Sequence, residues 1–353
     1  MRNRLDLRSM NKLINFYTKL NICEIINISF LCIIIPFLYT SYTLDPVLHP
    51  RFLAWSIFLL VSVIILISNR SPSLNDAIVI KKYHLLLVAF VVFSFISIIK
   101  AVNISEAIFD FLKNFCFLLS FLIFFNLFRK NDRFFEHVSV GMTISGLITG
   151  GIVFFMIMKS LITDYDLQKT YEIFGFMGHK NQLSLALFLF IPFSVKLVFT
   201  RSIVAKVLGL VTTILLFASI IILHTRSVVI GLTASLIFVF ILSVVYLFKK
   251  KKFSLNPSIL LLVVLIIGIL FSIEWFTPYN FSSVFIDRFK TSFDVHDNIR
   301  IKIWGESLEL FSGNVFLGTG GGNWKLTLPS VGITSLPSSS FSSTFFQRPH
   351  NDP

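Results

Sequence analysis

The sequence has little charge for its length. Only 14% of its 353 residues are Asp, Glu, Lys or Arg, whereas 55% are hydrophobic. A soluble domain carries about 25% charged residues, so an ordinary soluble globular protein is excluded. Disorder is also excluded, because it requires low hydrophobicity and high net charge. The remaining class is a membrane protein built from helices, and a chain of this length accommodates roughly nine to twelve spans of about 20 residues.

Cysteine is scarce as well. Cys23, Cys32 and Cys116 lie in or beside apolar runs, and no two of them form a CxxC pair. Neither a disulfide framework nor a zinc site is indicated, and buried packing is the simpler interpretation. Residues 1–20 are basic and polar, without a short apolar core followed by a small-residue cleavage site. We therefore expect no removable signal peptide.

Long apolar runs dominate the rest of the chain and predict an all-α, polytopic transmembrane helical bundle. About nine spans are expected, at Ile25–Thr40, Phe52–Ser68, Tyr83–Ile99, Phe111–Phe128, Phe135–Met158, Gln182–Phe199, Val204–Leu223, Val228–Phe248 and Ser258–Phe276. Residues 1–276 are thus expected to form the transmembrane region. Residues 277–353, which are mostly polar and rich in Ser, Gly and Pro, are expected to form a large external loop.

Basic residues alternate across the expected membrane. The formal net charge is +13, which in a soluble protein would suggest nucleic-acid binding. Most Lys and Arg residues, however, share one side with the N-terminus, including the run Lys249–Lys252. The positive-inside rule assigns this side to the cytoplasm, so the run is interpreted as an orientation anchor and no nucleic-acid partner is expected. An odd number of spans then places residues 277–353 outside the cytoplasm, where a long loop usually carries function.

Ionisable residues are almost missing from the middle of the expected spans. Glu24, Asp110 and Lys113 lie near span ends. An ion-coupled transporter usually carries acidic or histidine residues at mid-membrane, so transport is disfavoured. It remains an alternative, because broken helices can bind ions through backbone carbonyls.

Polar groups gather instead on the expected outer side. The segment Gly175–Gln182, just before the sixth span, offers His179, Lys180 and Asn181 as donors. A loop with a helix cap is the structural alternative for this segment. The short turn His224–Ser227 holds Arg226 at the membrane interface, where it is either a snorkelling anchor or a binding residue.

The external loop contains a predicted amphipathic helix. Within Asn298–Ser307, Arg300 and Trp304 are four residues apart and would share one helix face. Trp304, Leu308 and Phe311 would form an apolar stripe, so this helix is expected to lie on or against the membrane. An ordinary packing helix at the interface is the alternative.

Two smaller motifs follow in the same loop. Gly318–Trp324 lacks the Lys-Ser/Thr ending of a nucleotide P-loop, and a flexible loop is its simpler interpretation. His350 follows Pro349, which stiffens the chain, and precedes Asn351 and Asp352, which can orient the imidazole ring. A lone histidine is usually not catalytic, so its neighbours are what make His350 a candidate.

Two arginines and one histidine on one face of a membrane suggest a specific chemistry. Arginine donates paired hydrogen bonds to phosphate oxygens and stays charged, and histidine removes a proton near neutral pH. The set fits a reaction in which an acceptor hydroxyl displaces a phosphate-linked leaving group. Because nucleotide sugars are not supplied outside the cytoplasm, the expected donor is a lipid-linked sugar.

In this order, the motifs resemble the O-antigen ligase and O-antigen polymerase superfamily of bacterial membrane glycosyltransferases. Gly178–Asn181 is similar to the family's Gly-x-x-Asn segment, Thr225–Ser227 to its Ser/Thr-Arg step, Arg300-x-x-x-Trp304 with Gly318-x-Gly320 to its loop stretch, and Pro349–Asn351 to its His-Asn motif. The resemblance covers roughly Tyr171–Pro353, whereas the earlier spans match only in general character.

The resemblance implies transfer of a glycan from a polyprenyl diphosphate carrier, such as undecaprenyl diphosphate, at the periplasmic face of the bacterial inner membrane. Arg226 and Arg300 are implied to bind the diphosphate and His350 to act as general base on the acceptor hydroxyl. Lys180 and Asn181 are implied to line the donor site. No metal or cofactor is implied, and the sequence has no acidic cluster of the kind that would hold a metal.

The resemblance leaves two questions open. A ligase, with lipid A–core as acceptor in lipopolysaccharide biosynthesis, is favoured over a polysaccharide polymerase, whose acceptor is a second lipid-linked repeat unit. A transporter or a structural membrane subunit are the alternatives from other classes, and either would tolerate loss of His350. Because the family continues with a Gly-containing stretch and further spans, we expect this chain to be a fragment that ends within its external loop.

Overall fold

The computed structural model describes residues 22–43, 45–68, 81–164, 173, 175–223, 225, 227–235, 237–238, 241, 299–313 and 315–331. Within these ranges the secondary structure is helical and contains no strand, which confirms the predicted all-α class. The chain divides into two compact units. Unit 1 comprises residues 1–69 and 127–283, and unit 2 comprises residues 70–126 and 284–353.

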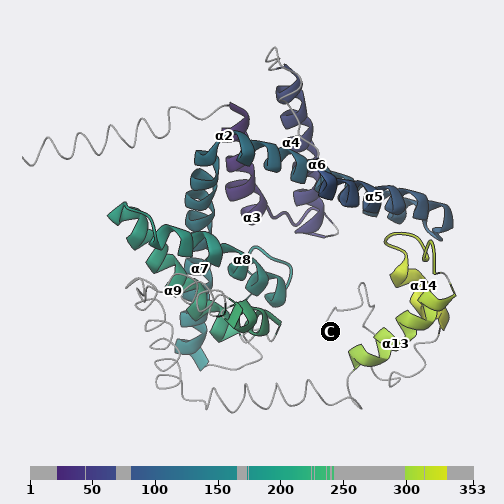
Figure 1. The fold of residues 1–353 in the computed structure, drawn as a ribbon. Coiled ribbons are helices and arrows are strands. Elements are labelled where there is room, and N and C mark those ends of the chain that lie inside the picture. The colour runs from purple at the N-terminus through teal and green to yellow at the C-terminus, as the bar shows by residue number, and fades with distance from the viewer. Residues whose placement is uncertain are drawn as a thin grey trace, which may run out of the picture. The chain divides into compact units, whose positions relative to one another are not determined.

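Six helices among the described residues are long and apolar enough to cross a membrane. They are α4 (Leu48–Ser68), α5 (Lys82–Ile96) with its 3-10 continuation η3 (Ser97–Lys100), α6 (Ile104–Lys130), α7 (Asp132–Asp164), α8 (Lys180–Val198) and α9 (Ile203–Leu223) (Figure 1). They coincide with the second to seventh predicted spans. The eighth predicted span is described only in part, as helix over residues 227–235, and the ninth lies outside the described residues.

The first predicted span is not one regular helix. It consists of α2 (Ile22–Ser29), a π-helical turn η1 (Phe30–Ile34) and α3 (Ile35–Phe37). The helix ends at Leu38, whose ψ of 117° is extended, and so stops short of the predicted Thr40. Pro36 lacks a backbone N–H and crowds the preceding turn, which gives a physical reason for the irregular backbone next to it.

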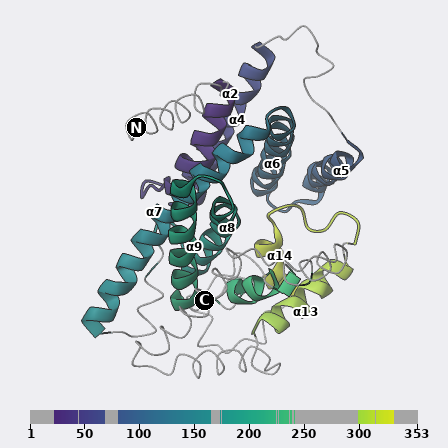
Figure 2. The same ribbon diagram turned by 60° about the vertical axis from the view of Figure 1, so that its left-hand side comes forward.

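Close packing of α7, α8 and α9 forms the core of unit 1, and the three helices lie side by side in both views (Figures 1 and 2). Gly209 allows the closest approach, because a Cβ at this position would lie 2.6 Å from the carbonyl oxygen of Ser194. Thr213 donates a hydrogen bond of 2.9 Å to the Ser194 hydroxyl across the same contact. Small residues and hydroxyls are the usual means of joining helices in a membrane.

The same core extends toward the loop that precedes α8. Its buried members are Val153, Ile157, Ile173, Met177, Leu183, Leu187, Phe190, Ile191, Leu216, Phe217, Ile220, Ile222, Leu223, Val228 and Leu232. Ile173 and Met177 come from the loop segment, and Val228 follows α9. The core therefore holds the start of α8 and the segment after α9 in one packed cluster.

Unit 2 joins α5 and α6 to a helix pair from the predicted external loop. Asn114 of α6 donates a hydrogen bond of 3.0 Å to the Ser94 hydroxyl of α5. The helix pair consists of α13 (Ile299–Ser312) and α14 (Trp324–Val331), which pack against each other. The predicted division of the chain at residue 277 stays a prediction, since it falls outside the described residues.

Candidate functional site

The predicted donor segment forms the capped start of α8. His179 is the N-cap residue, and its Nδ1 accepts a hydrogen bond of 3.1 Å from the backbone N–H of Asn181. Lys180 is the first residue of α8, and it is only 2% exposed. Burial of an ammonium ion costs free energy of folding unless polar partners compensate it, so a buried lysine is an unusual residue at this position. The N-terminal end of a helix also carries a partial positive charge.

The structure brings this segment together with the Thr225–Ser227 motif. The hydroxyls of Ser184, one turn into α8, and Thr225 are 2.7 Å apart, and both residues are buried. The carbonyl oxygen of Thr225 accepts hydrogen bonds from the backbone N–H groups of Val228 and Val229, so a new helical turn begins here. Two motifs that are more than 40 residues apart in sequence thus meet at one place.

Arg51, near the start of α4, supports the same loop. Its Nη2 donates 2.7 Å and 3.1 Å hydrogen bonds to the carbonyl oxygens of Phe176 and Pro36. Its Nε donates 3.0 Å to the carbonyl oxygen of Leu38, and its Nη1 lies 3.0 Å from Sδ of Met177. One guanidinium therefore ties the end of α3 to the loop before α8.

Two further motifs meet in unit 2. The indole Nε1 of Trp324, at the end of the glycine-rich segment, donates a hydrogen bond of 3.1 Å to the Ser307 hydroxyl of α13. Ile303 of α13 and Leu328 of α14 are both buried. The predicted helix around Arg300 and Trp304 is present as α13, while Gly318–Trp324 is docked on the N-terminal end of α6 and is not a free loop.

The residues proposed for the reaction itself are only partly described. The backbone of Arg300 lies in the first turn of α13. Arg226 and His350 lie outside the described residues, so their assignments stay predictions. Among the described residues no group of three or more His, Cys, Asp and Glu side chains gathers as a metal site would require, and metal independence likewise stays a prediction.

Two structurally important residues were not predicted as site residues. The sequence offers one signal for Arg51, because this residue falls on the expected outer side of the membrane, where basic residues are few. Asn323 directly follows three glycines. A polar side chain beside consecutive glycines suggests a close backbone approach, but its partner is more than 200 residues away in the sequence.

The described part of the site is polar and positively charged where α8 begins. A buried ammonium group, a helix N-terminus and the hydroxyls of Ser184 and Thr225 lie together. Lys180 and the Ser184–Thr225 contact are about one helical turn apart along α8, and Arg226 follows Thr225 directly in the chain.

Comparison with known proteins agrees with the motifs. Residues 211–353 match the family model described as O-antigen ligase, which confirms the resemblance predicted from the sequence. The matched range contains Arg226, Arg300 and His350. Neither the curated proteins nor the solved structures yield a match.

Proposed function

We propose that this protein is an O-antigen ligase-type glycosyltransferase of the bacterial inner membrane. It moves a glycan from a polyprenyl diphosphate carrier to lipid A–core, or to a related acceptor, at the periplasmic face. The observation that carries the proposal is the match of residues 211–353 to the O-antigen ligase family, because this range holds all three residues assigned to the chemistry. The helical, apolar character of the chain supports a membrane location.

In the proposed reaction, the acceptor hydroxyl attacks the anomeric carbon of the donor sugar. The bond from this carbon to the diphosphate oxygen breaks, and the polyprenyl diphosphate leaves. His350 takes the proton of the hydroxyl as general base. Arg226 and Arg300 bind the diphosphate oxygens and stabilise the negative charge that develops on them.

Lys180 and Asn181 line the donor site in this proposal. The position of Lys180 at the start of α8, beside the Ser184–Thr225 contact, supports this role, since Thr225 immediately precedes Arg226. Arg51 holds the preceding loop and is a positioning residue, because its guanidinium is bonded to backbone carbonyls.

The test is a gel of lipopolysaccharide from a strain that lacks the gene, with lipid-linked glycans extracted from the same cells. Loss of long chains from lipid A–core, with polymer accumulating on the carrier, is the expected result. Lipid A–core bearing a single repeat unit would instead identify the polymerase, which uses the same donor. An unchanged gel and an unchanged carrier pool would contradict both functions.

Complementation then tests the assigned residues. Arg300→Ala and His350→Ala are expected to abolish transfer while the protein still inserts into the membrane. Arg201→Ala is the matched control, because Arg201 is an exposed arginine in the short connection between α8 and α9. Normal product from a well-expressed Arg300→Ala or His350→Ala variant would overturn the site assignment but not the function.

A further inference from the structure

The glycine-rich segment Gly318–Gly322 packs closely against the connection between α5 and α6. Gly318, Gly320 and Gly322 have φ angles of +61°, +87° and +70°. A Cβ at Gly320 would lie 2.7 Å from both Cα and Cβ of Ala101, closer than side-chain atoms can pack. Glycine is required here both for the backbone conformation and for the space.

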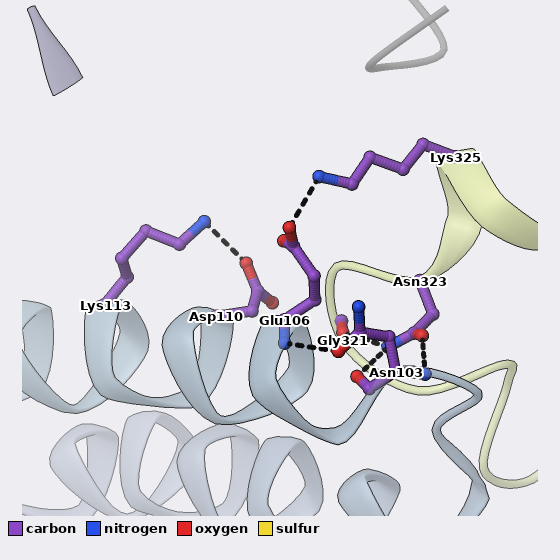
Figure 3. A network of polar contacts seen from close by, with 7 residues as sticks. All are labelled: Asn103, Glu106, Asp110, Lys113, Gly321, Asn323 and Lys325. Atoms are coloured by element: carbon purple, nitrogen blue, oxygen red, sulfur yellow. Dashed lines mark hydrogen bonds and ion pairs between the residues drawn. The ribbon is translucent and has the colours of Figure 1, made fainter. Parts of the chain in front are cut away.

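Asn323 fastens this segment to the first turn of α6. The backbone N–H of Asn103 donates a 2.6 Å hydrogen bond to Oδ1 of Asn323. In return, Nδ2 of Asn323 donates 3.1 Å to the carbonyl oxygen of Asn103 and 2.9 Å to that of Gly321 (Figure 3). Asn323 is fully buried, so these bonds are shielded from water. We call this contact the Asn103–Asn323 latch.

Neighbouring contacts extend the latch to α13. Lys325 of α14 pairs with Glu106 of α6 at 3.0 Å (Figure 3). Trp324 reaches Ser307 of α13 through its indole N–H. Both helices of the pair are thereby tied to the N-terminal end of α6, beyond which they lie in Figure 2.

One face of α13 is exposed among the residues of unit 2 that the structure describes. Trp304, Leu308, Phe311 and Val315 recur at helical spacing from α13 into the turn after it, and they are 53%, 68%, 53% and 55% exposed. The adjacent face is occupied, because Ile303 is buried and Ser307 is bonded to Trp324. Two aromatic and two aliphatic side chains in one stripe form a contiguous apolar patch. Such a patch indicates an interaction surface, whereas a single exposed apolar residue does not. We refer to Trp304, Leu308, Phe311 and Val315 as the α13 stripe.

The latch places this stripe close to the membrane surface. It is formed at the first turn of α6, which has the length and composition of a membrane span, so this turn lies where the span leaves the bilayer. Ile99 and Ile104, which lie on either side of the connection that holds the latch, are themselves exposed and apolar, as residues at the end of a membrane span are.

We infer that α13 is an interfacial helix whose stripe lies in the phospholipid surface on the side of the membrane where α6 begins. The Asn103–Asn323 latch sets the depth at which α13 lies in this surface. Lipid is the occupant that fits, because the latch holds the α13–α14 pair at the end of a candidate span, and because the stripe begins with tryptophan, an aromatic residue favoured at the boundary between headgroups and acyl chains. The inference requires no transferase activity, so it stands or falls separately from the proposed function.

A pair of fluorescent probes on the full chain tests this surface. In a variant without the three native cysteines, which are buried, either Leu308→Cys or Glu309→Cys receives an environment-sensitive fluorophore. The protein is reconstituted into vesicles of phosphatidylethanolamine and phosphatidylglycerol. At position 308 we expect quenching by a nitroxide on the upper acyl chain and little quenching by iodide, and at the exposed position 309 we expect the reverse.

Two results would overturn the inference. Strong iodide quenching at position 308 would mean that the stripe faces water. Protection at position 308 from both quenchers would mean that protein covers it, either a second copy or another segment of the chain.

The latch is tested in the Leu308→Cys background. Gly320→Ala is expected to weaken nitroxide quenching and increase iodide quenching, because the added methyl group forces the loop away from Ala101. Gly305→Ala is the matched control, since a Cβ at Gly305 meets nothing within 4 Å. Asn323→Ala, which removes the bonds but adds no atoms, should act in the same direction as Gly320→Ala. Unchanged quenching in both loop variants would show that the latch does not set the depth.

Discussion

At the scale of single residues, burial distinguishes the two lysines of α8. Lys180 opens the helix and is almost fully buried, at the end where the Ser184–Thr225 contact lies. Lys196 lies in the last turn, where its Nζ donates 3.3 Å to the Ser139 hydroxyl and lies 3.9 Å from the centre of the Phe135 ring. The two ammonium groups are therefore at opposite ends of one helix, in different surroundings.

This difference predicts different effects of the same substitution. Lys180→Met should lower the catalytic efficiency of glycan transfer roughly ten- to a hundredfold, because loss of a charged hydrogen-bond donor costs about 1.5–3 kcal/mol. Lys196→Met removes the same charge at the far end of the helix and should leave transfer nearly unchanged. Transfer from a purified lipid-linked donor, measured with both variants at equal protein amounts, provides the comparison. Equal losses in the two variants would argue for a general structural effect.

At the scale of elements, the packing of α8 against α9 depends on a missing side chain. A Cβ at Gly209 would lie 2.6 Å from the carbonyl oxygen of Ser194 and 2.9 Å from the backbone nitrogen of Val198. Backbone atoms cannot turn away as the end of a flexible side chain can. Any residue other than glycine at this position must therefore push the two helices apart, which also strains the nearby Thr213–Ser194 hydrogen bond.

Gly209→Ala is accordingly expected to destabilise the protein by about 1–3 kcal/mol, the usual cost of overpacking. Gly151→Ala in α7 is the control, because a Cβ there meets nothing within 4 Å. Alanine is also the better helix former, so this variant should be as stable as the original protein or slightly more stable. Thermal unfolding of the detergent-purified variants measures the difference. If the Gly209→Ala protein is as stable as the Gly151→Ala protein, α8 and α9 move apart at no cost in stability, which would contradict the prediction.

At the scale of the whole molecule, the latch has a consequence for topology. Ala101 and Asn103 precede α6 and contact residues 320–323, so the connection between α5 and α6 must lie on the same side of the membrane as α14. Three candidate spans, α6, α7 and α8, separate this connection from Arg201. If each crosses the membrane once, Arg201 lies on the opposite side.

Cysteine labelling with a membrane-impermeant maleimide tests this arrangement in cells with a permeabilised outer membrane. In the variant without native cysteines, Val102→Cys and Phe316→Cys should both react from the periplasm, and Arg201→Cys should react only after lysis. Val102 and Phe316 are 72% and 94% exposed, so reagent can reach both positions. Labelling of positions 102 and 316 from opposite sides would contradict the latch. Labelling of position 201 alone in intact cells would invert the orientation predicted from the basic residues.

The sequence by itself determined the class of this protein and the position of most of its spans. Apolar runs of sufficient length must form helices in a bilayer, because only a helix satisfies every backbone hydrogen bond within the segment. Hydropathy placed the helix ends less well. It predicted a span at Phe135–Met158, whereas α7 covers Asp132–Asp164, since helical hydrogen bonding continues through polar residues that a hydropathy pattern excludes. The motif order also sufficed to indicate a resemblance to the O-antigen ligase family, and residues 211–353 match the model of that family.

Only the tertiary structure decided which motifs meet. The contacts of Ser184 with Thr225, of Arg51 with Phe176 and of Asn103 with Asn323 join residues that are 41, 125 and 220 positions apart. No local pattern encodes such pairs, because each depends on how whole helices pack. Gly320 illustrates the reason: in the sequence it belongs to a loop that was expected to be flexible, and only the position of Ala101 against it reveals that the loop is docked.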